Sequence, residues 1–119
     1  MRHGYKNRKL SKPTDQRIAL LRNSTIALIN FGHMQTTNKR AKQVSRMAER
    51  VITLAKKGTL HHIRQIDKIL HERNTLNKLM QMAKDGKFGN KSSGFTRIVK
   101  VGLRRGDGAD MVLLELISA

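Results

Sequence analysis

Positive charge dominates this 119-residue chain and limits the compact folds open to it. Twenty-five Lys and Arg residues face eight Asp and Glu residues, for a formal net charge of +17 at pH 7. Because so many like charges repel one another in a compact state, such a chain favours a polyanionic partner. Nucleic acid fits that description best, and an acidic membrane surface is a weaker alternative. Hydrophobic residues still make up 38% of the chain, which is enough for one modest core and argues against disorder throughout.

Missing residue types narrow the possible functions. The chain has no cysteine, which excludes a disulfide scaffold, a cysteine zinc site and a thiol nucleophile. No apolar run approaches the ~18 residues of a membrane span, and the basic N-terminus lacks the apolar stretch of a secretory signal. We therefore expect a soluble, cytoplasmic protein without cofactors.

Residues 1–13 are expected to form an extended basic arm. They contain no acid and only Leu10 as a strong aliphatic residue, so they offer little to a core. Runs of like charge are typical of nucleic-acid-binding arms, although a disordered tail has the same composition. We divide the chain into this arm and a single domain at residues 14–119. The candidate contacts of the arm are Arg2, Lys6, Arg8, Lys9 and Lys12.

Hydrophobic spacing in the domain predicts helices that are followed by strands. Apolar residues recur every three or four positions in four segments, which predicts helices at residues 14–30, 38–57, 60–72 and between Asn74 and Gly86. Alternating or dense apolar residues predict strands at residues 33–37, 95–103 and 111–117. The last two form a hairpin, because Asp107-Gly108 is a strong turn signal. The order α-β-α-α-α-β-β predicts an α+β fold of two layers with a small mixed sheet.

Each helix is expected to turn one apolar stripe toward the core. The stripe of the first helix begins at Ile18, and that of the third begins at Leu60. The segment 38–57 has the clearest stripe. Thr37, just before it, is expected to cap the helix by accepting a hydrogen bond from a free N–H group of the first turn.

The helix predicted at 38–57 also has a basic edge opposite much of its apolar stripe. Lys39, Lys42, Arg46 and Arg50 lie at positions 0, +3, +7 and +11, which places them along one side of a helix. Such an edge can be an ordinary solvated surface, but Glu49 is its only acidic neighbour, so this spacing favours contacts with phosphates. Weaker candidates for the same role are Arg17, Arg22, Arg40, Lys56, Arg97, Lys100, Arg104 and Arg105.

No arrangement of residues in the sequence predicts an enzyme. His61 and His62 are adjacent, so on a helix they point about 100° apart, which does not suit one metal ion. No HExxH, phosphate-binding glycine loop or nucleophile motif is present. Solvated helix surface is the better interpretation of these histidines, and we expect neither a metal site nor catalysis.

Folded RNA is the polyanion that the composition favours. Readers of single strands need an aromatic platform, and the aromatic residues are only Tyr5, Phe31, Phe88 and Phe95. Phosphate and 2′-hydroxyl recognition of folded RNA fits better. The alternative is a basic DNA-binding architectural protein, with segments 39–57 and 60–72 as a helix-turn-helix. Much of the positive charge lies outside that helix-turn-helix unit, which argues against the DNA-binding alternative.

Several motifs then occur in one order over nearly the whole chain. They are Arg2-His3 with Arg8-Lys9-Leu10, Arg17-x-Ala19-x-x-Arg22-Asn23, Thr36-Thr37-x-Lys39-x-Ala41-Lys42, Val51-Ile52-Thr53-Leu54-Ala55-Lys56, Gly94-Phe95-Thr96-Arg97-Ile98 and Arg105-Gly106-Asp107. In these residues the chain resembles bacterial large-subunit ribosomal protein seventeen. The resemblance implies a structural component of the large ribosomal subunit that binds ribosomal RNA beside neighbouring ribosomal proteins. It also implies a two-layer α/β body, an N-terminal segment reaching into RNA, and RNA contacts at His3, Asn23, Thr36 and Thr37.

Overall fold

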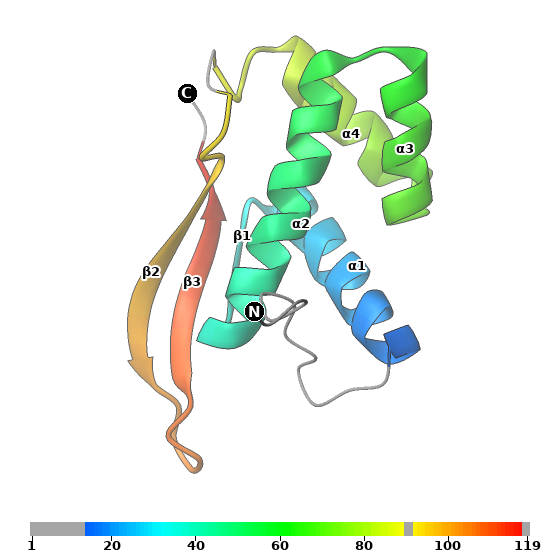
Figure 1. The fold of residues 1–119 in the computed structure, drawn as a ribbon. Helices are drawn as coiled ribbons and strands as arrows, with labels where there is room; N and C mark the ends of the chain where they lie inside the picture. Colours follow the sequence, from blue (N-terminus) through cyan, green and yellow to red (C-terminus); the bar gives the residue numbers. More distant parts are fainter. Residues whose placement is uncertain (1–13, 90–91, 118–119) are drawn as a thin grey trace, which may run out of the picture.

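A computed structural model describes residues 14–89 and 92–117, so the arm expected at residues 1–13 lies outside the described residues. The elements in chain order are α1 (Thr14–Phe31), β1 (His33–Thr37), α2 (Asn38–Lys57), α3 (Leu60–Leu70), α4 (Arg73–Lys84), β2 (Thr96–Leu103) and β3 (Asp110–Leu116) (Figure 1). This order and the α+β class agree with the sequence-based prediction.

The three strands form one sheet in the order β1-β3-β2, and both neighbouring pairs are antiparallel. The expectation of a mixed sheet is therefore wrong. β1 and β2 run in the same direction, but β3 lies between them, so no parallel pair forms. Three helices separate β1 from the hairpin, and local sequence patterns do not show on which side of the hairpin β1 will pair.

Helices cover one face of this sheet, and among the described residues no helix covers the other (Figure 1). α2 is the central element, because it packs against all three strands and against the three other helices. One cluster of buried residues joins α1 and α2 to the sheet through Leu28, Val44 and Val112. The other joins all four helices through Ile29, Val51, Ile66 and Leu79. The apolar stripe of α2 contributes to both clusters.

Two ends of the predicted stripes do not reach the core. The side chain of Ile18 is 44% exposed and that of Leu60 is 63% exposed. Both residues lie near the N-terminal ends of their helices, and neither belongs to the two core clusters. Farther along the same stripes, Thr25, Leu28, Ile66 and Leu70 are buried as predicted.

The helix ends combine confirmed and corrected features. Gly58 ends α2 in the left-handed conformation, with φ 67°, and its N–H donates to the Leu54 carbonyl at 3.2 Å. Thr37 precedes α2, but its side chain makes no capping hydrogen bond, so that expectation is wrong. Thr59 caps α3 instead, accepting a hydrogen bond from the His62 N–H at 3.4 Å. His71, with φ 56°, ends α3 before the predicted residue 72.

Two phenylalanines on either side of the loop before β2 belong to the core. Phe88 and Phe95 are 2% and 1% exposed and pack edge to face, with ring centroids 5.9 Å apart. The Lys56 ammonium lies 5.1 Å from the centroid of the Phe95 ring, a distance that allows a cation–π interaction. These rings connect the end of α2 with the start of β2.

Candidate nucleic-acid interface

The basic edge of α2 is formed as predicted and is longer than predicted. Lys39, Lys42, Arg46 and Arg50 are all exposed, and they lie opposite the buried stripe that includes Ala41, Ala48 and Val51. Lys57 continues the edge at +18, is also exposed, and could have been found from the same period. We call Lys39, Lys42, Arg46, Arg50 and Lys57 the α2 ridge. It spans about 27 Å, given a rise of about 1.5 Å per residue.

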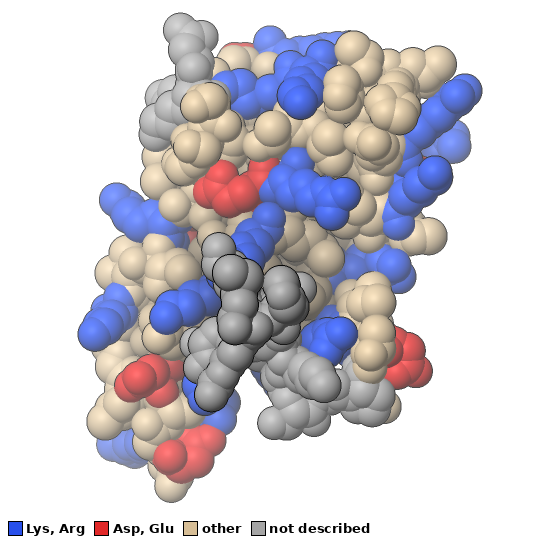
Figure 2. Space-filling model, viewed as in Figure 1, with Lys and Arg blue, Asp and Glu red and all other residues tan. Residues whose placement is uncertain are grey.

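The α2 ridge lies on a predominantly basic face. Figure 2 shows Lys and Arg side chains spread over the face drawn there, with fewer Asp and Glu side chains among them. Lys39, Lys42 and Arg50 have no ion-pair partner within the described ranges. Their charge is therefore not neutralised by the fold.

Glu49 is the acidic residue closest in sequence to the ridge, but its carboxylate accepts hydrogen bonds from the sheet. Its Oε1 atom accepts hydrogen bonds from the backbone N–H and the hydroxyl group of Thr96, both at 2.9 Å. Ser45 completes the group, with 2.7 Å between its Oγ and the Thr96 Oγ1. The carboxylate is thus directed at the start of β2.

Several predicted contact residues have partners within the protein. The Nε atom of Arg22 donates to the Ile69 carbonyl at 2.9 Å and joins α1 to α3. Arg97 pairs with Glu115 across the hairpin. Lys56 is half-buried against the Phe95 ring. Each of these cations contributes to the fold, and less of its hydrogen-bonding capacity is available for a ligand.

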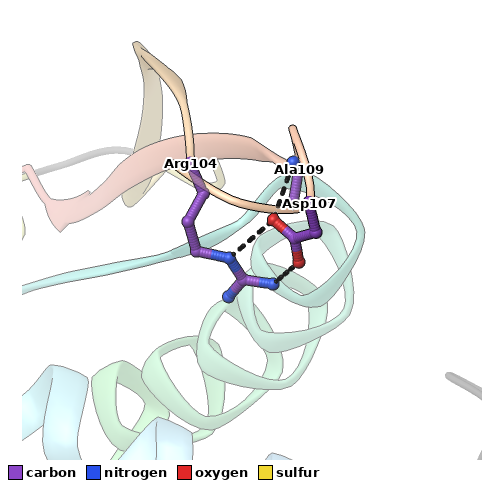
Figure 3. Close-up of polar contacts among 3 residues, drawn as sticks. All are labelled: Arg104, Asp107 and Ala109. Atoms are coloured by element: carbon purple, nitrogen blue, oxygen red, sulfur yellow. Dashed lines mark hydrogen bonds and ion pairs between the residues drawn. The ribbon is translucent and has the colours of Figure 1, made fainter.

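Arg104 and Asp107 close the hairpin turn with a paired contact (Figure 3). Arg104 Nε lies 3.0 Å from Asp107 Oδ1, and a terminal guanidinium nitrogen donates to the other carboxylate oxygen. The Ala109 N–H adds a hydrogen bond to Oδ1 at 3.2 Å. The hydrogen bonds from Arg104 and from the Ala109 N–H lower the pKa of Asp107 from 3.8 to about 2. The same pairing raises the pKa of Arg104.

The remaining predicted contacts are spread over the surface. Arg40, Asn23 and Arg105 are exposed, and Arg17 is half-buried. Arg40 follows Lys39 directly, so it lies about 100° around α2 from the ridge. Thr36 is buried on the helix-facing side of β1, opposite Val112, whereas Thr37 is half-buried at the start of α2. Six further candidates lie outside the described residues: Arg2, His3, Lys6, Arg8, Lys9 and Lys12.

Other kinds of site do not form in the parts of the chain that the structure describes. No group of three or more His, Asp or Glu side chains there could hold a metal ion. His61 and His62 instead make local contacts on α3, with Gln65 and Thr59 respectively. Within residues 14–89 and 92–117, no helix is both long enough and apolar enough to span a membrane.

The fold and this surface define a small basic α+β protein with a row of cations on its central helix. The family described as ribosomal protein L17 matches residues 20–117. A protein of Clostridium botulinum (strain Hall) named large ribosomal subunit protein bL17 is 46% identical over 114 residues, covering 96% of this chain and 98% of that protein. The protein of the same name from Clostridium acetobutylicum is 45% identical over 117 residues, covering 98% and 100%. The chain belongs to the ribosomal protein L17 family.

This assignment confirms the resemblance seen in the sequence motifs. It supports a structural role in the large ribosomal subunit, and it agrees with the prediction that the chain is not an enzyme.

Proposed function

We propose that this protein binds folded ribosomal RNA of the large subunit through contacts with the phosphate backbone, and that the α2 ridge is its main binding surface. The observation that carries the proposal is the ridge itself, which presents five exposed cations along one helix. Charge-assisted hydrogen bonds from Lys and Arg to phosphate are among the stronger contacts available to a protein.

The position of Glu49 supports this assignment. Its Oε1 atom accepts two hydrogen bonds from Thr96, so this oxygen is directed at β2. Within the described residues Lys39, Lys42 and Arg50 have no ion-pair partner, so their positive charges repel one another in the folded protein. Neutralisation of these charges by a polyanion would offset the repulsion.

The aromatic residues favour recognition of backbone and shape. Phe88 and Phe95 are buried in the core, which leaves Phe31, 74% exposed, as the one accessible phenylalanine of the described residues. Proteins that read single-stranded bases usually stack them on several aromatic side chains. A folded RNA with closely spaced phosphates suits this surface better.

The other predicted contacts take secondary places in the proposal. We propose further RNA contacts from the cations of residues 1–13 and His3, from the basic residues Arg17, Arg40 and Arg105, and from the polar residues Asn23 and Thr37. Arg22, Lys56, Arg97 and Arg104 contribute less, because each has a contact within the protein. The buried side chain of Thr36 acts by shaping β1. Neighbouring large-subunit proteins would be further partners, on ribosomes in the bacterial cytoplasm.

A pair of charge-matched variants tests the proposal. Lys42→Gln, Arg46→Gln and Arg50→Gln together remove three ridge cations and keep good helix formers. We expect affinity for large-subunit ribosomal RNA to fall by about 1–3 kcal/mol. The control combines Arg64→Gln, Lys68→Gln and Lys84→Gln, three exposed cations of α3 and α4.

The two variants lose the same charge, so a difference between them reports the position of the contact. An equal loss of affinity would mean that RNA binding depends on the total positive charge of the protein and not on the position of the ridge. A larger loss in the control variant would favour α3 as the binding helix, as in the DNA-binding alternative.

A further inference from the structure

β2 is an outer strand of the sheet that leaves apolar side chains in solvent. Ile98, Val99, Val101 and Leu103 are 36%, 42%, 56% and 72% exposed. They are four of the seven large hydrophobic residues exposed in the described part of the chain. Exposed apolar residues that occur singly need no explanation, but a contiguous group on one element indicates an interaction surface.

The free edge of β2 also presents unpaired backbone groups. The Ile117 N–H donates to the Phe95 carbonyl at 2.8 Å, and the register pairs Arg97 with Glu115 and Val99 with Leu113. Hydrogen-bonded and non-hydrogen-bonded pairs alternate in an antiparallel ladder. The backbone groups of Arg97 and Val99 therefore face β3, and those of Ile98 and Lys100 face away from it.

Glu49 and a bulge mark the two ends of this edge. The Thr96 N–H, which is the first donor on the same side, is bound by the Glu49 carboxylate at 2.9 Å. At the other end the register shifts between Lys100 and Gly102, which makes Val101 an extra residue in β2. The open part of the edge is thus short and centred on Ile98 and Lys100.

Side chains on both faces would be covered by a strand added here. Ile98 pairs with the buried Leu114, so it lies on the helix side of the sheet, and Val99 pairs with Leu113 on the open side. An added extended chain would bury both, together with Val101. Pairing with a sheet edge in this way gives affinity through the main chain and specificity through alternate side chains.

The chemistry of the edge favours a protein segment over the other occupants. The outward carbonyl groups of Ile98 and Lys100 would meet phosphate oxygens of RNA as acceptor against acceptor, and RNA would leave the apolar side chains partly wet. A second copy would bring two chains of net charge +17 together. It would also place the Arg97 and Lys100 side chains of both copies on two neighbouring strands, where like charges repel. Lys100 is exposed and has no ion-pair partner within the described ranges, so it complements a carboxylate.

We propose that the free edge of β2 between Ile98 and Val101 docks an extended segment of another large-subunit protein, which adds a fourth strand and places a carboxylate near Lys100. The proposal rests on assembly into the large subunit, as the family assignment supports, and it does not depend on which cations bind RNA.

Amide hydrogen exchange on the natural chain is the direct test, comparing the free protein with the same protein in purified large subunits. We expect the amides of Ile98 and Lys100 to exchange about 100-fold or more slowly in the subunit, as paired strand amides do. The Val99 amide, already paired with β3, serves as the internal reference. Unchanged exchange at Ile98 and Lys100 overturns the proposal. Protection that rises with concentration in the free protein also overturns it, in favour of a second copy.

Two substitutions at one position separate the backbone contact from the side chain. Ile98→Pro removes the outward N–H but spares the hydrogen bonds to β3, because proline is tolerated where the N–H of an edge strand faces outward. Ile98→Ala keeps that N–H and removes most of the side chain. We expect the Ile98→Pro variant to dissociate from the large subunit at a lower salt concentration than the Ile98→Ala variant. Both variants should bind isolated ribosomal RNA with the affinity of the natural chain. Equal retention of the two variants contradicts strand addition, and weakened RNA binding by both assigns the edge to RNA instead.

A photo-crosslinking amino acid at Val101 identifies the class of neighbour in assembled subunits. An adduct to a protein segment that itself carries a carboxylate and alternating apolar residues supports the proposal. Adducts to RNA alone overturn it without affecting the proposed function of the α2 ridge.

Discussion

Glu49 on α2 and Thr96 at the start of β2 are joined by two hydrogen bonds to a single carboxylate oxygen, each 2.9 Å long. The two residues are 47 positions apart, and the contact fixes the first residue of β2 against the central helix. It has two further effects. The carboxylate is directed toward β2, and the first outward N–H of the β2 edge is occupied.

Glu49→Ala should destabilise the free protein by about 1–3 kcal/mol, because the Thr96 N–H and hydroxyl group lose their shared acceptor. Urea unfolding followed by circular dichroism measures the change. Arg50→Ala, at the exposed neighbouring position, is the control and should have a small effect. If the two variants unfold at the same urea concentration, the Glu49–Thr96 contact has no role in stability.

Val51→Asp should unfold the domain or destabilise it by about 3–5 kcal/mol, because it places an unpaired charge in the core. Val51 is fully buried and belongs to the larger core cluster. The matched variant Arg50→Asp, on the ridge side of the same helix, should keep its fold, and thermal melting compares the two.

The variant that combines Lys42→Gln, Arg46→Gln and Arg50→Gln should melt at the same temperature as the natural chain or slightly higher, since it relieves repulsion between like charges. Early melting of that variant would show that the two faces of α2 are wrongly assigned.

The affinity for ribosomal RNA should fall steeply with salt. If about 8 phosphates are neutralised, log affinity should decrease against log salt concentration with a slope of about −6 to −7. Filter binding over a series of salt concentrations gives this slope. A slope shallower than about −2 would mean that most of the basic residues remain solvated in the complex.

The hairpin turn should keep its Arg104–Asp107 contact down to unusually low pH. The pKa of Asp107 is lowered from 3.8 to about 2 in the folded protein, so this carboxylate contributes stability that is complete above about pH 4. The contribution decreases as the pH falls from 3.8 toward 2 and is lost below that. NMR titration of the Asp107 carboxyl carbon should give a midpoint near 2. In Arg104→Gln the midpoint should move toward 3.8, and an unchanged midpoint would exclude Arg104 as the main cause.

Local patterns in the sequence were sufficient for the order of elements and for the two faces of α2. Helical periodicity places Lys39 and Arg50 opposite Ala48 whatever the rest of the chain does, because about 3.6 residues complete each turn. The turn at Asp107-Gly108 likewise depends on residues that are adjacent in the chain. The whole ridge was therefore predictable, and Lys57 follows from the same period although the prediction stopped at Arg50.

Tertiary structure decided the features that depend on residues far apart in the chain. The burial of Phe88, the bond between Arg22 and the Ile69 carbonyl, and the position of β3 between β1 and β2 all join segments separated by other elements. No local period records which segment will lie across from a given side chain. For the same reason the sequence showed only that Arg22 and Arg50 are both cations. The packing of α1 against α3 engages Arg22 in a hydrogen bond to the Ile69 carbonyl. Arg50 remains on the surface of α2, where its charge is open to a partner.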